Sequence, residues 1–250
     1  HSSFEIIIVD TANYEENDDI PFVYNNLLEM DNRINVIKWD KPFNFHSVNN
    51  WAVSFARGSI LCFLNNDTEV ISRDWMEQML SICLRSDVAF VGAKLLYPNK
   101  TIQHAGITVG KGGVAGHDFL YYPYDSPGYF GRLVQIRNVS AVTGACMMVR
   151  KDVFESLGGF DEEFILSYGD VDICLRALEK GLLNVWTPYA LLYHYESRTR
   201  GYEDTDQKKE RFQKEKEYFL SKWKFYIQNG DPYYNPNLDY KKSDYVLRLF

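Results

Sequence analysis

Three residues that lie far apart in the sequence carry side chains suited to chemistry on a charged ligand: Asp67, Asp170 and His194. Asp67 directly follows an apolar run that is typical of a buried strand. A carboxylate at that position can hold a hard divalent cation against phosphate oxygens, and ligands of open α/β sheets bind at the carboxyl ends of the strands. An ordinary turn formed by Asn65, Asn66 and Asp67 explains the same run equally well.

Asp170 is expected at the start of an amphipathic helix, because an apolar stripe at helical spacing runs from Val171 to Leu178. The amino end of a helix stabilises a carboxylate in its charged form, and an ionised carboxylate can accept a proton from a hydroxyl as a general base. The alternative is a plain helix-capping aspartate, with Asp172 and Arg176 as an ion pair one turn apart.

His194 ends an apolar segment that is predicted to be a strand. A neutral imidazole is a frequent ligand of transition metals, although a lone histidine at a strand end is more often a hydrogen-bonded structural residue. Each of the three positions therefore leaves two interpretations open when it is taken alone.

Apolar runs alternate with helical patterns along the chain, which predicts an α/β fold with a mixed, mostly parallel sheet flanked by helices. The predicted strands are residues 5–9, 34–39, 60–64, 88–97, 141–149 and 184–193, and the predicted helices are residues 48–55, 74–84, 151–157, 170–181 and 206–226. Residues 106–131 form a glycine- and aromatic-rich excursion, which either carries function or is a surface subdomain. We expect one domain over residues 1–230 and an irregular tail over 231–250.

The composition limits the classes of partner. The 250 residues carry a net charge of −7, which argues against a broad nucleic-acid surface because such a surface needs clustered positive charge. The cysteines lie among apolar neighbours, which favours reduced core thiols in a cytosolic protein over disulfides; they are Cys62, Cys83, Cys146 and Cys174. The Lys-rich helix near residues 208–224 allows peripheral contact with a membrane surface, but Glu210, Glu215 and Glu217 dilute its charge and favour packing onto the domain.

Four motifs in order resemble those of family-two glycosyltransferases, and in particular the bacterial polysaccharide and O-antigen enzymes of rhamnosyltransferase type. Residues 63–69 resemble the Asp-x-Asp-type segment, and residues 143–150 resemble the strand before the acceptor region. Residues 158–164 and 169–176 resemble the catalytic-base segment, and His194 with Ser197 resembles the late histidine motif. The resemblance extends over about residues 4–200, and several motifs in one order are far more specific than a single short match.

The resemblance implies a nucleotide-sugar transferase fold of the GT-A type and a role for each matching residue. Asp67 and His194 would bind Mg²⁺ or Mn²⁺, Asp170 would be the base of an inverting transfer, and Asp172 would lie near the acceptor. The nucleotide would contact Asp10, Asn65, Asn66 and Asp67. The implied donor is a UDP- or dTDP-sugar, and the implied acceptor is a saccharide or a lipid-linked saccharide, with no nucleic acid involved. The expected location is the cytoplasm, at the inner face of the membrane for a lipid-linked acceptor.

Three departures from the family pattern leave other classes open. Asn65 stands at the first acidic position of the Asp-x-Asp motif, and Gly169 stands where many relatives have glutamate. The opening strand and first helix of the fold have no counterpart, so we expect an N-terminally truncated domain. A catalytically impaired interaction module of the same fold and a sugar nucleotidyltransferase are the alternatives. The sequence does not identify the sugar that is transferred.

Overall fold

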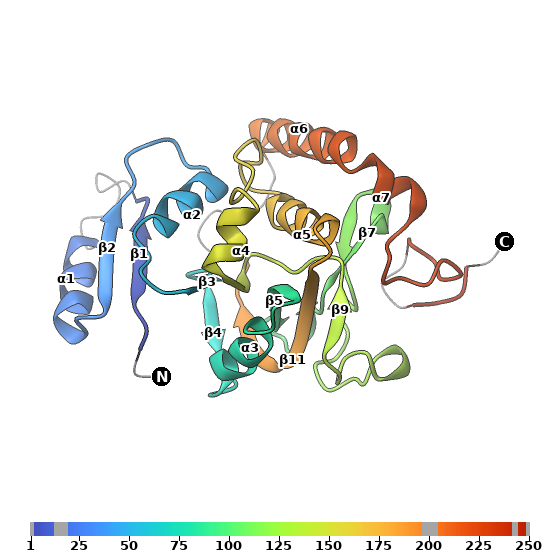
Figure 1. Ribbon diagram of the computed structural model, residues 1–250, viewed down its shortest axis with the longest axis horizontal. Coiled ribbons are helices and arrows are strands. Elements are labelled where there is room, and N and C mark those ends of the chain that lie inside the picture. Colours follow the sequence, from blue (N-terminus) through green and yellow to red (C-terminus); the bar gives the residue numbers. More distant parts are fainter. Residues whose placement is uncertain (1–2, 13–19, 197–204, 242–244, 249–250) are drawn as a thin grey trace.

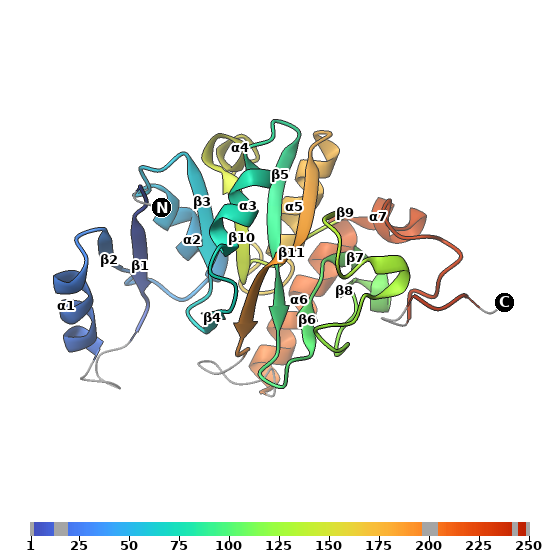
Figure 2. The same ribbon diagram turned by 90° about the horizontal axis from the view of Figure 1, so that it is seen from below.

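The computed structural model describes residues 3–12, 20–196, 205–241 and 245–248. Its main sheet has seven strands, with β3, β10, β5, β11 and β4 in that spatial order, β6 beside β5 and β9 beside β11 (Figures 1 and 2). The bounds are β3 Ile60–Leu64, β4 Thr68–Val70, β5 Val88–Leu96, β6 Ile102–His104, β9 Arg137–Val139, β10 Cys146–Arg150 and β11 Leu183–His194.

The mixed α/β sheet is as predicted, but the expectation that it is mostly parallel is wrong. Within the described part of the main sheet, only β5 and β11 pair in parallel. Strand β10 runs antiparallel to both of its neighbours, β3 and β5, and β11 is antiparallel to β4 and β9. The sequence pattern missed this because a buried strand has the same apolar run in either direction.

A second sheet lies at one end of the molecule (left in Figure 1). Its two strands, β1 (Ile6–Asp10) and β2 (Ile34–Lys38), pair in parallel, with helix α1 (Ile20–Met30) connecting them. Among the described strands, β1 pairs with β2 and β3 pairs with β10, and no ladder joins the two sheets. The backbone amides of Arg57 and Gly58 donate to the carboxylate of Glu5, which ties the second sheet to the loop before β3.

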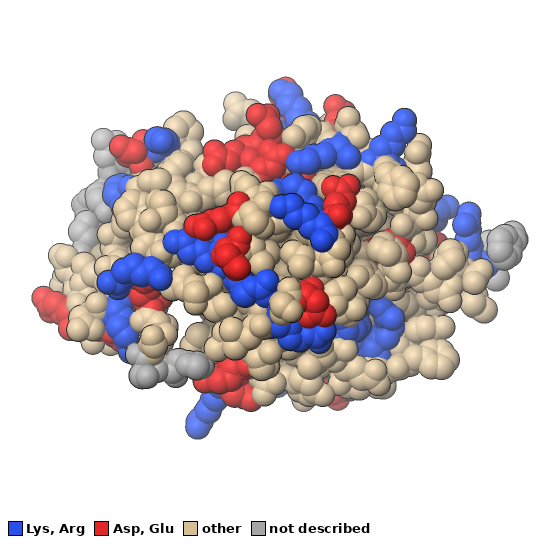
Figure 3. Space-filling model, in the orientation of Figure 1, with Lys and Arg blue, Asp and Glu red and all other residues tan. Residues whose placement is uncertain are grey.

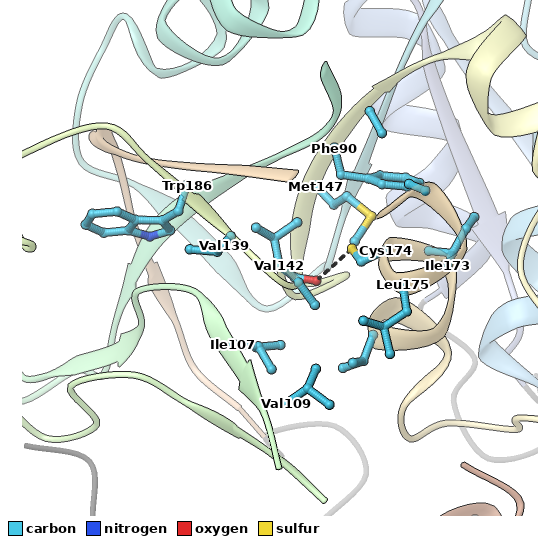
Figure 4. Packing of buried hydrophobic residues seen from close by; sticks show 14 of the residues in the cluster. Phe90, Ile107, Val109, Val139, Val142, Met147, Ile173, Cys174, Leu175 and Trp186 are labelled. Carbon is cyan, nitrogen blue, oxygen red and sulfur yellow. Dashed lines mark hydrogen bonds between the residues drawn. The ribbon is translucent and has the colours of Figure 1, made fainter. Parts of the chain in front are cut away.

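The alternating side chains of the main sheet build two hydrophobic cores. Met147 and Val149 of β10 face the larger core, which includes residues of α4 (Lys151–Ser156), α5 (Gly169–Glu179) and α6 (Asp206–Lys222). Cys146 and Met148 face the smaller core under α3 (Trp75–Cys83). Figure 2 shows α3 on one side of the sheet and α5 and α6 on the other, and Figure 4 shows the larger core around Phe90. This alternation is the period of two that a strand imposes.

The four cysteines are free thiols, as the sequence indicated. Cys83, Cys146 and Cys174 are buried, and the Cys174 thiol lies 3.9 Å from the carbonyl oxygen of Val142 (Figure 4). Cys62 is exposed, so its placement in the core was a wrong prediction. It alternates on β3 with the buried Leu61 and Phe63, and β3 has a strand neighbour on one side alone among the described residues.

The residues of the excursion and the tail pack together. Strands β7 (Ile107–Val109) and β8 (Ala115–His117) form a ribbon, and Asp118 follows it, buried with Lys111 and Arg137. The ring of Tyr245 stacks on Phe119 at 4.5 Å, and its hydroxyl donates to Asp118 at 2.6 Å. The described residues of the tail, 231–241 and 245–248, form no helix or extended strand, and they supply buried aromatic rings to the larger core.

The Lys-rich helix α6 packs onto the domain through a buried carboxylate. Glu215 accepts hydrogen bonds from the backbone amides of Ile165, Leu166 and Ser167 at 2.6–3.1 Å, directly before α5. In Figure 3 positive and negative side chains are interspersed over the visible face, α6 at the top included. None of the described helices is both long and apolar enough to cross a membrane.

Asp172 holds the end of α6 against α5. Its carboxylate is fully buried and receives hydrogen bonds from Arg176 at 2.9 Å and from the indole of Trp223 at 2.9 Å, and the ammonium group of Lys222 lies 2.7 Å away. The predicted acceptor contact through this carboxylate is therefore inconsistent with the structure, because both oxygens are occupied inside the protein. The ion pair with Arg176 is the alternative that the sequence offered, whereas the motif position did not reveal Lys222 and Trp223, which come from the end of α6.

Replacing Asp172 with alanine should lower the free energy of unfolding by about 3 kcal/mol, because two cations and an indole N–H would lose their buried acceptor. Urea denaturation measures the change. Asp152→Ala is the matched control: its carboxylate is 78% exposed beside Arg150, so its loss should cost less than about 1 kcal/mol. Equal effects of the two substitutions would contradict the structural role of Asp172.

Candidate active site

Asp67 and His194 meet at the rim of the main sheet. Asp67 lies in the turn between β3 and β4, and His194 ends β11 opposite Thr68. The antiparallel pairing of β4 with β11 therefore brings the two side chains together, with Asp67 Oδ1 3.1 Å from His194 Nε2. The amide of Tyr195 donates to the Asp67 carbonyl at 2.8 Å and fixes the register of the two segments.

Gln103, on β6, sets the orientation of the His194 ring. Its amide nitrogen donates to Glu196 at 3.1 Å, so its oxygen is the atom that lies 2.7 Å from His194 Nδ1. That oxygen can only accept, so Nδ1 carries a proton, and Nε2 is the ring nitrogen that faces Asp67. Sequence reasoning missed Gln103, because a single glutamine in an apolar strand carries no recognisable signal.

The Asp67–His194 pair suits a cation. Asp67 Oδ1 is buried and receives no hydrogen bond, and it faces Nε2 of His194, to which the Asn65 amide comes within 3.3 Å. A carboxylate oxygen and an imidazole nitrogen 3.1 Å apart are a favourable pair when a positive charge lies with them, either a proton on Nε2 or a bound metal ion. Carboxylate and imidazole are ligands that Mn²⁺ accepts, and Mg²⁺ also takes carboxylates. Within the described ranges no group of three or more histidine, cysteine, aspartate or glutamate side chains is placed to hold a metal ion.

Asp170 lies in the first turn of α5, as predicted, and its carboxylate is partly exposed. One of its oxygens accepts from the amide of Gly144 at 2.9 Å, and the other accepts from the amide of Val171 at 2.8 Å. The neighbouring carbonyl of Ala145 accepts from the amide of Asn65 at 2.9 Å. Asp170 and the Asp67 turn are thus held on two adjacent residues of the segment before β10.

Gly169 has a packing partner that explains the missing side chain. A Cβ atom at this position would lie 2.1 Å from Nε2 of His46, which is buried on α2 (Phe45–Val53). The other ring nitrogen of His46 lies 2.7 Å from the carbonyl of Phe164, and burial lowers the pKa of the ring. The imidazole therefore fills the space where many relatives carry a glutamate.

The remaining predicted ligand residues lie on other segments of the chain. Asp10 ends β1, where its carboxylate is 1% exposed, 3.1 Å from the ammonium group of Lys38. Asn66 is exposed in the turn before β4. Ser197, the other residue of the late histidine motif, lies outside the described residues.

A pocket lined by aromatic rings lies next to His194. Its walls are Tyr97, Pro98, Tyr121, Tyr195 and Glu196. The rings of Tyr97 and Tyr121 stack with their centroids 5.3 Å apart, and Tyr121 takes a positive φ of 66° to hold that position. Aromatic faces combined with a carboxylate present both apolar and hydrogen-bonding surface to a ligand.

A double-mutant cycle tests the packing of Gly169 against His46. Gly169→Ala alone should lower the free energy of unfolding by about 1–3 kcal/mol, because the added methyl overpacks the site. In a His46→Ala background the same methyl group should be tolerated, which gives a coupling of at least about 1 kcal/mol in thermal or urea denaturation. Additive effects would show that the ring does not occupy this space.

Comparison with known proteins identifies the family. Residues 1–158 match glycosyl transferase family 2. The chain is 43% identical over 248 residues to the uncharacterized protein y4gI of Sinorhizobium fredii, and 41% identical over 225 residues to the O-antigen biosynthesis protein RfbC of Myxococcus xanthus. These alignments cover 99% and 88% of the chain but only 27% and 17% of those proteins, so the chain spans about a quarter or less of their length.

The fold has known counterparts as well. The mannosyltransferase PcManGT of Pyrobaculum calidifontis, solved with GDP-Man and Mn²⁺, superimposes with a TM-score of 0.55 at 16% identity, over 79% of this chain and 49% of that one. At this identity the similarity concerns the fold, and it confirms the predicted GT-A type. With the family match over more than half of its length, the chain belongs to glycosyltransferase family 2.

Proposed function

We propose that this domain transfers a sugar from a UDP- or dTDP-sugar to a hydroxyl group of a saccharide or lipid-linked acceptor, with inversion at the anomeric carbon. The observation that carries the proposal is the pairing of Asp67 with His194 at 3.1 Å, together with the attachment of Asp170 and of the turn before Asp67 to the adjacent residues Gly144 and Ala145. Family membership favours transfer over a sugar nucleotidyltransferase reaction. A location at the cytoplasmic face of the membrane is part of the proposal for a lipid-linked acceptor.

Asp67 and His194 would hold Mg²⁺ or Mn²⁺ through Oδ1 and Nε2, which face each other at 3.1 Å. A divalent ion there offsets the negative charge that develops on a departing nucleoside diphosphate. Gln103 supports the site by keeping the Nε2 lone pair of His194 directed at the ion. Asn65 offers an amide where the Asp-x-Asp motif has its first carboxylate. Asp67, His194 and the diphosphate of the donor would therefore contribute more of the affinity for the metal ion.

Asp170 would act as the general base. The amides of Gly144 and Val171 fix its carboxylate while each oxygen keeps a second lone pair for a substrate. The acceptor oxygen bonds to the anomeric carbon and gives its proton to Asp170, while the bond from that carbon to the diphosphate oxygen breaks. One displacement inverts the configuration at that carbon.

The aromatic pocket beside His194 supports a saccharide as the ligand. Tyr97 and Tyr121 offer ring faces to the apolar face of a pyranose, and Glu196 offers a hydrogen-bond acceptor to its hydroxyl groups. PcManGT, which shares the fold, was solved with a nucleotide sugar.

The variant Asp170→Asn should lower kcat by about 10²–10⁴-fold, because the amide keeps the shape and the bond from Gly144 but does not accept a proton. Initial rates with a panel of UDP- and dTDP-hexoses and octyl glycoside acceptors measure the loss. Asp152→Asn, on an exposed helix start, should leave kcat unchanged. Near-normal transfer by Asp170→Asn in a folded protein would rule out the base, and no transfer by the parent protein would support the impaired interaction module.

The variant Gln103→Leu should weaken Mn²⁺ binding by about 10–100-fold, because His194 would lose the acceptor that fixes its ring. Calorimetric titration of Mn²⁺ into the protein with UDP present measures the affinity. The control is Thr101→Val. The hydroxyl group of Thr101 donates to Asn99, and it is not among the groups that hold Asp67 or His194. An unchanged affinity in Gln103→Leu would argue against His194 as a metal ligand.

A further inference from the structure

Two histidines that the motifs did not single out form a pair behind the site. His104 ends β6 and His117 ends β8, and their Nδ1 atoms are 2.9 Å apart with the ring planes at 83°. His104 is fully buried, whereas His117 is partly exposed. At this distance one ring must donate a hydrogen to the other.

The surroundings of His104 decide which ring donates. The amide of Thr143 points at His104 Nε2 across 3.5 Å, so that nitrogen presents its lone pair. Burial lowers the pKa of both rings, and the neutral His104 therefore carries its single hydrogen on Nδ1. It donates this hydrogen to Nδ1 of His117, which leaves the hydrogen of His117 on Nε2. Within the described residues this Nε2–H has no hydrogen-bond acceptor in the protein.

The histidine pair and the proposed base are attached to the same backbone segment. Thr143 donates to His104, and the next amide, that of Gly144, donates to the carboxylate of Asp170 at 2.9 Å. The histidine pair and Asp170 are thus anchored on consecutive peptide groups. The carboxylate of Asp170 raises the pKa of the His117 ring more than any other charge does, whereas His194 lowers it. His117 is therefore electrostatically coupled to both Asp170 and His194.

The neutral Nε2–H group of His117 is suited to donate a hydrogen bond to an uncharged oxygen atom of a ligand. A diphosphate is bound best by cations and by amides at a helix start, whereas a sugar hydroxyl or ring oxygen is matched by a single neutral N–H. We propose that His117 contacts the acceptor saccharide and donates its Nε2 hydrogen to an oxygen next to the hydroxyl group that Asp170 deprotonates. This inference rests on the proposed transferase function and adds to it a residue that selects and positions the acceptor.

The tautomer can be tested without substrate. Long-range ¹H–¹⁵N correlation spectra of the ¹⁵N-histidine-labelled protein at pH 7.5 should show His117 with a protonated Nε2 and an unprotonated Nδ1, assigned by its absence in His117→Gln. A His117 ring with its hydrogen on Nδ1, or one that is doubly protonated, would overturn the proposal.

The contact itself is tested by kinetics with two variants. His117→Leu removes the donor and should raise KM for the best octyl glycoside acceptor by about 3–10-fold, the value of one neutral hydrogen bond. His117→Gln places an amide N–H in the same region and should restore part of the loss. Hydrolysis of the donor by water, measured without acceptor, should stay within about twofold of the parent in both variants.

A control in the same ribbon separates contact from fold. Thr108→Val removes the buried hydroxyl that donates to Asp118 on the opposite side of β7 and β8, so it should lower the thermal midpoint without changing KM for the acceptor. Equal losses of transfer and donor hydrolysis in His117→Leu, or an unchanged KM, would overturn the acceptor contact. A parent protein with neither transfer nor donor hydrolysis would refute the proposed function and this inference with it, even with the expected tautomer.

Discussion

The geometry of the site depends on the backbone of three consecutive residues, Thr143 to Ala145, directly before β10. The amide of Thr143 donates to His104, and the amide of Gly144 donates to the carboxylate of Asp170. The carbonyl of Ala145 accepts from the amide of Asn65. Because backbone polar groups in such a setting require partners, one short segment fixes the end of β3, the start of α5 and the base of the excursion relative to one another. Strand β10 holds that segment in place by pairing with both β3 and β5.

The second constraint is the burial of charge around this segment. The buried carboxylate of Asp118, next to His117, pairs with the cations of Lys111 and Arg137 and accepts a hydrogen bond from the hydroxyl group of Tyr245. Those bonds fix residues 111–118 of the excursion and tie Tyr245 of the C-terminal segment to them. A fully paired buried carboxylate stabilises one arrangement, because a rearranged excursion would leave the charge without partners.

The proposed metal ligands and the proposed base differ in how the protein holds their side chains. Asp67 Oδ1 and His194 Nε2 face each other at 3.1 Å, and Gln103 fixes the orientation of the ring through Nδ1. Each carboxylate oxygen of Asp170 accepts a hydrogen bond from one backbone amide and keeps a second lone pair that can accept another. Functional sites commonly keep such unsatisfied groups, whereas the rest of the fold satisfies them.

The sequence by itself determined the fold type and most elements, because the apolar periods of strands and helices and the order of four motifs are local properties. It also singled out Asp67, Asp170 and His194 through their positions at element ends. It did not reveal helix α1, whose Phe22 and Met30 are 68% and 80% exposed and therefore form no buried stripe. Tertiary structure alone decided the antiparallel direction of β10, the structural use of Asp172 and the places of Gln103, His46 and His117. Those outcomes depend on contacts between residues up to 118 positions apart, as between His46 and Phe164, and no local pattern encodes which distant partner a polar side chain will meet.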